Sequence, residues 1–294
     1  MYLKIDKREY LYSLLSIVLF WGNNLLLKLE NVTFGYQKEG KPLLSGVNLE
    51  LIPGGRIGII GDNGSGKSTI AKLILGLHSP NQGSVKLFGQ RACWGKHYPE
   101  LGYIGDPSYN PGGLGLPMDI SVKDLINSFK KLWFGSNQEQ NFELEEQLAI
   151  QEFCKTDVAK LSKGQRMRVM AFLALAKRPK LLIADEATEG LDKDSREAVI
   201  SAIKQASSNP NFGMIWISHR RHEVALLTNE VYELAEGQLN RSSINEFSCE
   251  LETNSINNHQ IYQNICKDEA LEIIGEVFTS RKFSKFKFTG TRQN

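Results

Sequence analysis

The stretch GDNGSGKST, residues 61–69, decides the fold of this chain. It follows the phosphate-loop pattern, in which a glycine and four further residues precede Gly-Lys-Ser. On one side lies the short apolar run RIGII (56–60), and on the other a segment with helical spacing extends from Lys67 to Leu75 and ends before Gly76. A buried strand, a glycine-rich turn and a helix in this order predict a cradle for phosphate groups.

Each residue type in this stretch suits a bound triphosphate. Glycine lets the backbone wrap around phosphate oxygens, so that successive N–H groups and a helix N-terminus point at the anion. Lys67 can reach the β- and γ-phosphates, and the hydroxyl of Ser68 is a hard oxygen suited to Mg²⁺. The residues expected to bind the nucleotide are Gly61, Asp62, Asn63, Gly64, Ser65, Gly66, Lys67, Ser68 and Thr69.

An acidic pair follows a second apolar run, LLIADE (181–186). Such a strand delivers Asp185 at its carboxyl end, the edge of an α/β sheet where ligands bind. Asp185 is expected to hold Mg²⁺ together with Ser68, and Glu186 to polarise the attacking water. Two carboxylates alone are a weak signal, but behind a phosphate loop they predict hydrolysis of a nucleoside triphosphate.

The remaining pattern is typical of an α/β domain. Strands are expected at 25–34, at its antiparallel neighbour 47–52, and at 84–88, 213–218 and 230–234, with helices at 164–177 and 193–206. This alternation predicts an α/β phosphate-loop NTPase fold with a mostly parallel sheet and an antiparallel β subdomain. Helical spacing at 121–134 and 142–153 predicts a small helical insertion within about residues 106–165.

The two ends of the chain differ from this domain. In residues 1–24, basic side chains precede an apolar run, Leu11–Trp21, that is too short for the roughly 20 residues of a bilayer span. Three interpretations stay open: a packing helix or upstream extension, a short membrane anchor, and a cleaved signal peptide. Residues 243–294 form a C-terminal extension, predicted to be partly irregular, with a helix at 268–277 and a basic, aromatic segment at 281–288.

The composition is that of an ordinary globular protein and gives no sign of a nucleic-acid partner or a disulfide scaffold. The chain has 294 residues, 41% hydrophobic and 23% charged, as is ordinary for a soluble globular protein. Its formal charge of +2 is too weak to indicate a nucleic-acid partner. The four cysteines are far apart in the chain and have no paired metal-ligand spacing. Nothing in their spacing suggests a disulfide scaffold, and a reduced cytosolic protein is expected. The cysteines are Cys93, Cys154, Cys249 and Cys266.

Three further segments indicate which family of phosphate-loop NTPases the chain resembles. LSKGQ (161–165) precedes the acidic strand, EGLD (189–192) follows Glu186, and His219 ends the strand GMIWIS. Their order and spacing closely resemble the nucleotide-binding domain of ATP-binding cassette transporters. The resemblance covers roughly residues 25–242, most of the chain.

The resemblance implies ATP hydrolysis in a head-to-tail dimer, in which each ATP lies between the phosphate loop of one subunit and the signature segment of the other. Carried over by position, Ser162, Gly164 and Gln165 would contact the γ-phosphate bound by the partner, and the start of a helix is a natural anion site. His219 resembles the switch histidine that contacts the γ-phosphate and orients the catalytic glutamate; the alternative is a histidine packed at a strand end. Asp192 resembles the aspartate at the dimer interface.

Three positions need separate comment. Tyr36 stands where the family places an aromatic side chain that stacks on adenine, although a tyrosine in a strand is more often structural. Asp106 replaces the family's glutamine; it still offers an oxygen to Mg²⁺, so we expect altered coupling or slower turnover rather than lost binding. Lys163 replaces the first glycine of the signature segment, but Gly164 is retained.

For the whole chain, the resemblance implies a subunit that drives a membrane transporter. Its partners would be a second nucleotide-binding domain and a separate transmembrane permease docked near residues 106–122, with the chain peripheral on the cytoplasmic face of the membrane. Two alternatives stay open. One is a soluble ATPase acting on nucleic acid or protein assembly, which the single cassette and the lack of a long coiled coil disfavour, so no nucleic acid is expected. The other is a low-turnover regulatory subunit, suggested by Asp106.

Overall fold

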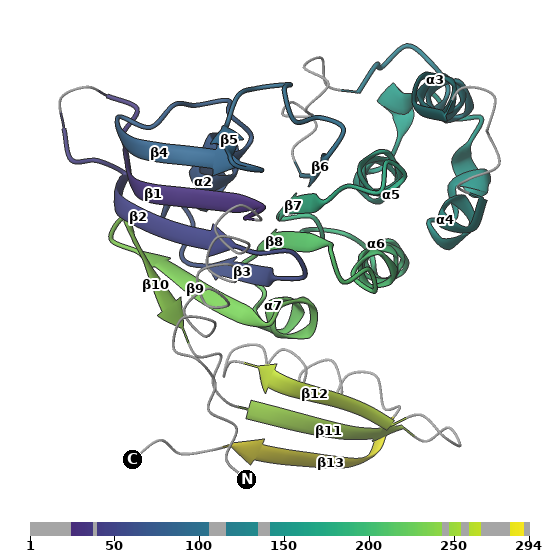
Figure 1. The fold of residues 1–294 in the computed structure, drawn as a ribbon. Coiled ribbons are helices and arrows are strands. Elements are labelled where there is room, and N and C mark those ends of the chain that lie inside the picture. Colours follow the sequence, from purple (N-terminus) through teal and green to yellow (C-terminus); the bar gives the residue numbers. More distant parts are fainter. Residues whose placement is uncertain are drawn as a thin grey trace, which may run out of the picture.

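The computed structural model describes residues 25–37, 40–105, 116–134, 142–242, 247–253, 259–265 and 283–290. Figure 1 shows how these parts are arranged. The predictions for residues 1–24, for Asp106 and for a helix at 268–277 lie outside the described residues.

A six-stranded sheet forms the centre of the domain, with the strand order β10-β9-β3-β8-β7-β6. Its neighbouring strands run parallel except for β9 and β10, so the predicted mostly parallel sheet is confirmed. The strand β8 is buried along its whole length, as its apolar sequence predicts. The bounds are β3 Arg56–Ile60, β6 Leu101–Ile104, β7 Leu181–Asp185, β8 Gly213–Ile217, β9 Glu230–Ala235 and β10 Gln238–Ser242.

Four helices cover this sheet (Figure 1). They are α2 (Lys67–Ile74), α5 (Lys163–Leu175), α6 (Lys193–Ala206) and α7 (Arg221–Leu227). Helix α2 contacts both β7 and the second sheet of the domain, so it joins the two layers. The start of α2 and both ends of α6 agree with the predicted helices.

The second sheet is antiparallel, with the order β2-β1-β4-β5. Leu29 of β1 lies opposite Leu49 of β2 on one side and Val85 of β4 on the other, and all three side chains are buried. This sheet is the predicted antiparallel β subdomain. Its strands are β1 Leu27–Phe34, β2 Leu44–Leu51, β4 Gln82–Leu87 and β5 Gln90–Arg91.

The helical insertion contains α3 (Val122–Phe134) and α4 (Phe142–Gln147). The prediction of one continuous helix over 142–153 is wrong in its second half. Ala149 adopts a left-handed backbone with φ of 49°, which interrupts the helical hydrogen bonds, and Ile150–Phe153 continues as the 3₁₀ turn η3. A second 3₁₀ turn, η4 (Val158–Lys160), leads towards α5.

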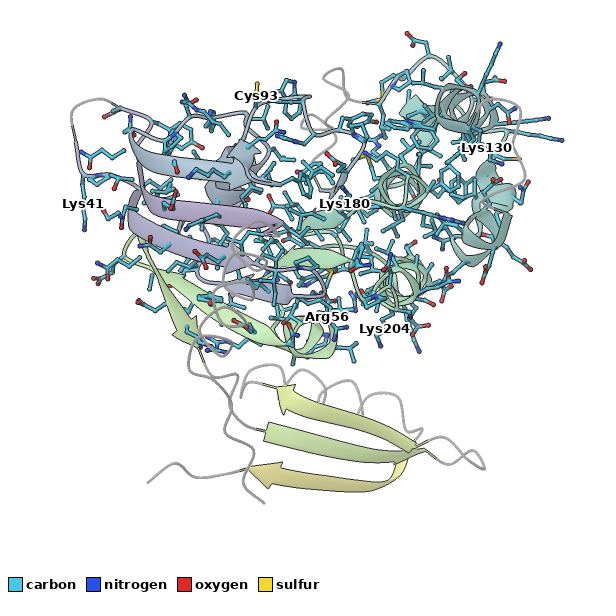
Figure 2. All side chains as sticks on the ribbon, in the orientation of Figure 1. Lys41, Arg56, Cys93, Lys130, Lys180 and Lys204 are labelled. Carbon is cyan, nitrogen blue, oxygen red and sulfur yellow. The ribbon has the colours of Figure 1, made fainter. Side chains whose placement is uncertain are left out.

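An ion pair is buried between the two helices of the insertion. Lys130 of α3 contacts Glu145 of α4, and their side chains are only 8% and 7% exposed. Figure 2 labels Lys130 between these elements. Gln151 of η3 donates a hydrogen bond of 3.3 Å to Glu145 Oε2, so all three elements of the insertion meet at this carboxylate.

A third sheet follows β10 in the chain, with the order β12-β11-β13. Its strands are β11 Phe247–Thr253, β12 His259–Ile265 and β13 Phe283–Gly290, and the pairing is antiparallel. The expectation of an irregular tail is therefore wrong for these segments. The register pairs residue 250 with residue 287 and residue 252 with residue 285, positions so far apart in the chain that no local pattern reveals the pairing. Among the described residues, no helix is long and apolar enough to cross a membrane.

Candidate active site

The phosphate loop leaves the end of β3 and enters α2 at Lys67. Gly61 has φ of 152°, and a Cβ atom there would lie 2.5 Å from the carbonyl oxygen of Leu234. Gly66, the residue before α2, has φ of 108°. Both positions therefore require glycine, one for close packing and one for its backbone conformation.

Lys67 lies inside the curve of this loop. Its side chain is 5% exposed, and Nζ donates hydrogen bonds to the carbonyl oxygens of Gly61 at 2.7 Å and Asp62 at 2.8 Å. The hydroxyl of Ser65, also in the loop, is buried and has no hydrogen-bond partner among the described residues. A buried ammonium and an unpaired hydroxyl in a glycine-rich loop fit the triphosphate of ATP.

The two residues predicted to hold Mg²⁺ meet in the structure although they are far apart in the chain. Ser68 Oγ, in the first turn of α2, donates a hydrogen bond of 3.3 Å to Asp185 Oδ1 at the end of β7. A hydroxyl and a carboxylate side by side form a hard-oxygen pair that fits Mg²⁺. Asp106, the third predicted ligand, lies outside the described residues.

Glu186 follows directly after β7 in an uncommon backbone conformation. Its φ is 52°, and its N–H donates a 2.9 Å hydrogen bond to the carbonyl oxygen of Ile217 in β8. A hydrogen bond to Glu189 raises the pKa of Glu186 to about 7, helped by burial and by the negative charges of Glu189 and Asp185. A carboxylate with a pKa near neutrality is suited to accept a proton from water.

The pairing of Glu189 with Glu186 was not predicted from the sequence, although Glu189 lies in the EGLD segment. The turn after Glu186 creates it, as the N–H of Glu189 donates to the carbonyl oxygen of Glu186 at 3.1 Å. Lys163 lies nearby, with its Nζ 3.0 Å from where a Cβ on Gly190 would be. Its positive charge contributes to lowering the pKa of Glu189, after the hydrogen bond to Glu186 and the charge of His219.

A cavity of about 590 Å³ opens beside these carboxylates. Ser68, Asp185 and Glu186 line it, together with residues of α5. Lys72 and Arg166 also face this space, and no sequence motif indicated them. The remaining lining residues are Gly105, Leu161, Lys163, Met167, Met170 and Glu189. Carboxylates and cationic side chains therefore line the same cavity, which reaches Glu186.

The signature segment forms the start of α5. Ser162 Oγ accepts a hydrogen bond from the N–H of Gln165, and Gln165 Oε1 accepts one from the N–H of Ser162, each at 3.1 Å. This capping box fixes the helix N-terminus, where Ser162 is exposed. Gly164 has a packing reason, because a Cβ there would lie 2.3 Å from Ser195 Oγ and 2.8 Å from Asp192 Oδ2.

Asp192 caps α6 in this structure. Its carboxylate accepts hydrogen bonds of 2.8 Å from both the N–H and the hydroxyl of Ser195, and the first of these is the main reason why its pKa is lowered. The capping contact brings the EGLD segment against the signature segment through Gly164. A place at a dimer interface stays a prediction.

His219 and Tyr36 follow strands of different sheets. His219 follows β8, next to the end of β7, and is exposed, so it is not a packed core histidine. Tyr36 is 61% exposed, and its hydroxyl lies 3.1 Å from Thr69 Oγ1 at the start of α2. Its ring lies perpendicular to those of Phe34 and His78, with centroids 5.1 and 5.5 Å away. The structure thus brings an exposed Tyr36 to the phosphate loop.

The parallel sheet, the phosphate loop and the carboxylates after β7 define a phosphate-loop NTPase. Residues 44–189 match the model of the ABC transporter family. This part of the chain is therefore an ATP-binding cassette domain, which binds and hydrolyses ATP.

Similar proteins agree with this assignment. The zinc uptake system ATP-binding protein ZurA of Listeria monocytogenes is 28% identical over 259 residues, which is 85% of this chain and 93% of ZurA. The ZurA of Listeria innocua is 28% identical over 261 residues, with 86% and 93% covered. A solved ATP-binding subunit of an ABC transporter matches with a TM-score of 0.65 at 22% identity, covering 74% of this chain and 90% of that one. A dimeric ATP-binding cassette in a post-hydrolysis state, bound to ADP and phosphate, matches with a TM-score of 0.64 at 22% identity, covering 75% of this chain and 99% of that one. Both structural similarities concern the fold alone.

Proposed function

We propose that this chain is the ATP-hydrolysing subunit of a membrane transporter, peripheral on the cytoplasmic face of the membrane and bound to a separate permease. The observation that carries the proposal is the meeting of Lys67, Ser68, Asp185 and Glu186 in one site of an ABC domain. The names of the two Listeria relatives support a role in transport, since the similarity extends over most of the chain.

Each residue of the site has a separate task in this proposal. Lys67 and the loop amides bind the β- and γ-phosphates. Ser68 and Asp185 hold Mg²⁺, whose charge offsets that of the phosphate oxygens. Glu186 accepts a proton from the attacking water, and His219 orients the γ-phosphate and Glu186.

The proposal also needs a second nucleotide-binding domain. Ser162, Gly164 and Gln165 of each subunit would meet the γ-phosphate on the partner, and Asp192 would lie at the interface. The capping box that fixes the N-terminus of α5 and the exposure of Ser162 support this role, because a helix N-terminus is a natural anion site. Tyr36 would stack on adenine, which its exposed ring supports.

ATP binding and hydrolysis by the purified protein test the active site. Lys67→Ala should lose Mg-ATP binding, whereas Glu186→Gln should keep binding and lose about 10²–10⁴-fold in turnover. Lys160→Ala is a control, since that side chain is 74% exposed. Wild-type affinity in Lys67→Ala would refute the site, and wild-type turnover no faster than Glu186→Gln would favour a regulatory subunit.

Transport is tested separately. A tagged chain expressed from its own locus should co-purify in mild detergent with a multi-span membrane protein. Because the Listeria relatives are named for zinc uptake, ⁶⁵Zn uptake by cells carrying Glu186→Gln is the first transport assay to run. A chain that hydrolyses ATP yet never associates with a membrane protein would contradict the transporter role alone.

A further inference from the structure

Glu223 is a buried carboxylate that the proposed mechanism does not use. It lies on α7, and its side chain is 1% exposed. The next residue, Val224, and Leu227 are also buried, so an apolar side chain would suit this face of the helix. Burying a carboxylate costs free energy unless partners compensate for lost hydration, so its partners indicate its purpose.

The two oxygens of Glu223 have different surroundings. Oε2 accepts a hydrogen bond from the hydroxyl of Thr188, which is itself buried. Oε1 faces Arg196 Nε and Arg220 Nη1, each at 3.8 Å, and His222 Nε2 at 3.9 Å. Oε1 has no hydrogen-bond partner within the described part of the chain.

These partners belong to two catalytic segments. Thr188 lies in the turn that carries Glu186 and Glu189. Arg196 reaches the end of the same turn, where its Nη2 donates a 3.2 Å hydrogen bond to the carbonyl oxygen of Leu191. Arg220 belongs to the other segment, since it directly follows His219.

Hydrogen bonds within the second segment and to the neighbouring strand β3 hold it as well. The N–H of Arg220 donates to Ser218 Oγ at 3.0 Å, and the N–H of Ser218 donates to the carbonyl oxygen of Ile59 at 3.2 Å. Glu223 therefore connects the turn at 186–192 with the segment at 218–220. Its charge attracts one arginine from each side.

We propose that Glu223 is a positioning residue that holds Glu186 and His219 at the separation needed for hydrolysis. The proposal rests on the active site proposed above. Both arginines lie beyond hydrogen-bond distance from Oε1, so the contact works through charge, which a neutral side chain cannot replace. The hydrogen bond from Thr188, in contrast, needs only an acceptor oxygen.

The variant Glu223→Gln separates the role of the negative charge from the role of the oxygen that accepts the hydrogen bond of Thr188. The amide keeps the size and an acceptor for Thr188 but removes the charge. We expect kcat to fall about 10–100-fold, as for other residues that orient a reacting group, while KM for ATP stays within about threefold. A merely structural residue would instead change the melting temperature and leave kcat of the folded fraction unchanged.

A second pair of variants keeps the test decisive if Glu223→Gln does not fold. Arg220 is 23% exposed, so Arg220→Gln should be tolerated, and it should also lower kcat. The matched control is Arg221→Gln, one residue later, because Arg221 pairs with the half-exposed Glu233 at 3.3 Å. Equal kcat in the Arg220 and Arg221 variants would overturn the proposal.

A double-mutant cycle with His219→Ala tests the route of the effect. If Glu223 acts by placing His219, the double variant should be no slower than the slower single variant. Losses that multiply independently, or wild-type kcat in Glu223→Gln, would overturn the role of Glu223 and leave the active site intact. Wild-type affinity for Mg-ATP in Lys67→Ala would overturn the active site itself.

Discussion

Lys130→Met should strongly destabilise the helical insertion. The ammonium of Lys130 is the charge partner of Glu145, and both side chains are almost fully buried. Methionine keeps the apolar stem of lysine but removes the charge. Glu145 then retains the 3.3 Å hydrogen bond from Gln151 but has lost its counter-charge.

The expected magnitude follows from this burial. Removing one partner of a buried ion pair costs about 3–5 kcal/mol, which is a large share of the ~5–15 kcal/mol that stabilises a typical domain. With a urea m-value of about 3 kcal/mol/M, the unfolding midpoint would fall by about 1–1.7 M. The exposed pair of Lys180 and Glu100 offers a control, since Lys180 is 60% exposed and Lys180→Met should cost about 0–1 kcal/mol.

Urea unfolding followed by circular dichroism measures both variants. The double variant Lys130→Met with Glu145→Leu should recover most of the loss, because it removes the unpaired charge and replaces the pair by apolar side chains. Equal midpoint shifts in Lys130→Met and the Lys180 control would refute the reasoning. So would a double variant less stable than Lys130→Met alone.

Three further predictions concern the active site and the signature segment. The acid limb of kcat/KM should lie near pH 7, because Glu186 must be ionised to act as a base and its pKa is raised to about 7. In Glu189→Gln this limb should move to lower pH, because the hydrogen bond that raises the pKa of Glu186 is changed and a negative charge is lost. An unchanged pH profile would contradict this. Gly164→Ala places a Cβ 2.3 Å from Ser195 Oγ and should cost about 1–3 kcal/mol in urea unfolding, whereas an unchanged midpoint would mean that α5 and α6 separate freely. Ser162→Ala removes the cap of α5 and should cost about 0.5–2 kcal/mol, with Ser162→Asn expected to recover most of it in the same assay.

The sequence predicted the phosphate loop and the main sheet because their signals are local. The glycine spacing at 61–66 and the apolar run of β7 each specify structure within a few residues. The position of Lys67 followed from the phosphate-loop pattern, and that of Asp185 from the rule that ligands bind at the carboxyl ends of parallel strands.

Contacts between distant segments could not be predicted in this way. Gly164 cannot carry a Cβ atom because Ser195 of α6 packs against it. The arginines that face Glu223 come from α6 and from the segment after β8. The helix break at Ala149 has no glycine or proline to mark it. The sheet of β11–β13 depends on pairing across long intervals, which periodicity in one strand does not reveal.

At position 186, the residue that would be most stable differs from the residue that hydrolysis requires, because the backbone there is left-handed. A side chain with a Cβ in this conformation costs on the order of 1–2 kcal/mol, and glycine or asparagine would accept it more readily. Selection for thermal tolerance alone would therefore favour replacing the glutamate. Engineering of this protein for robustness must score catalysis in the same round, or the most heat-resistant variants will be the inactive ones.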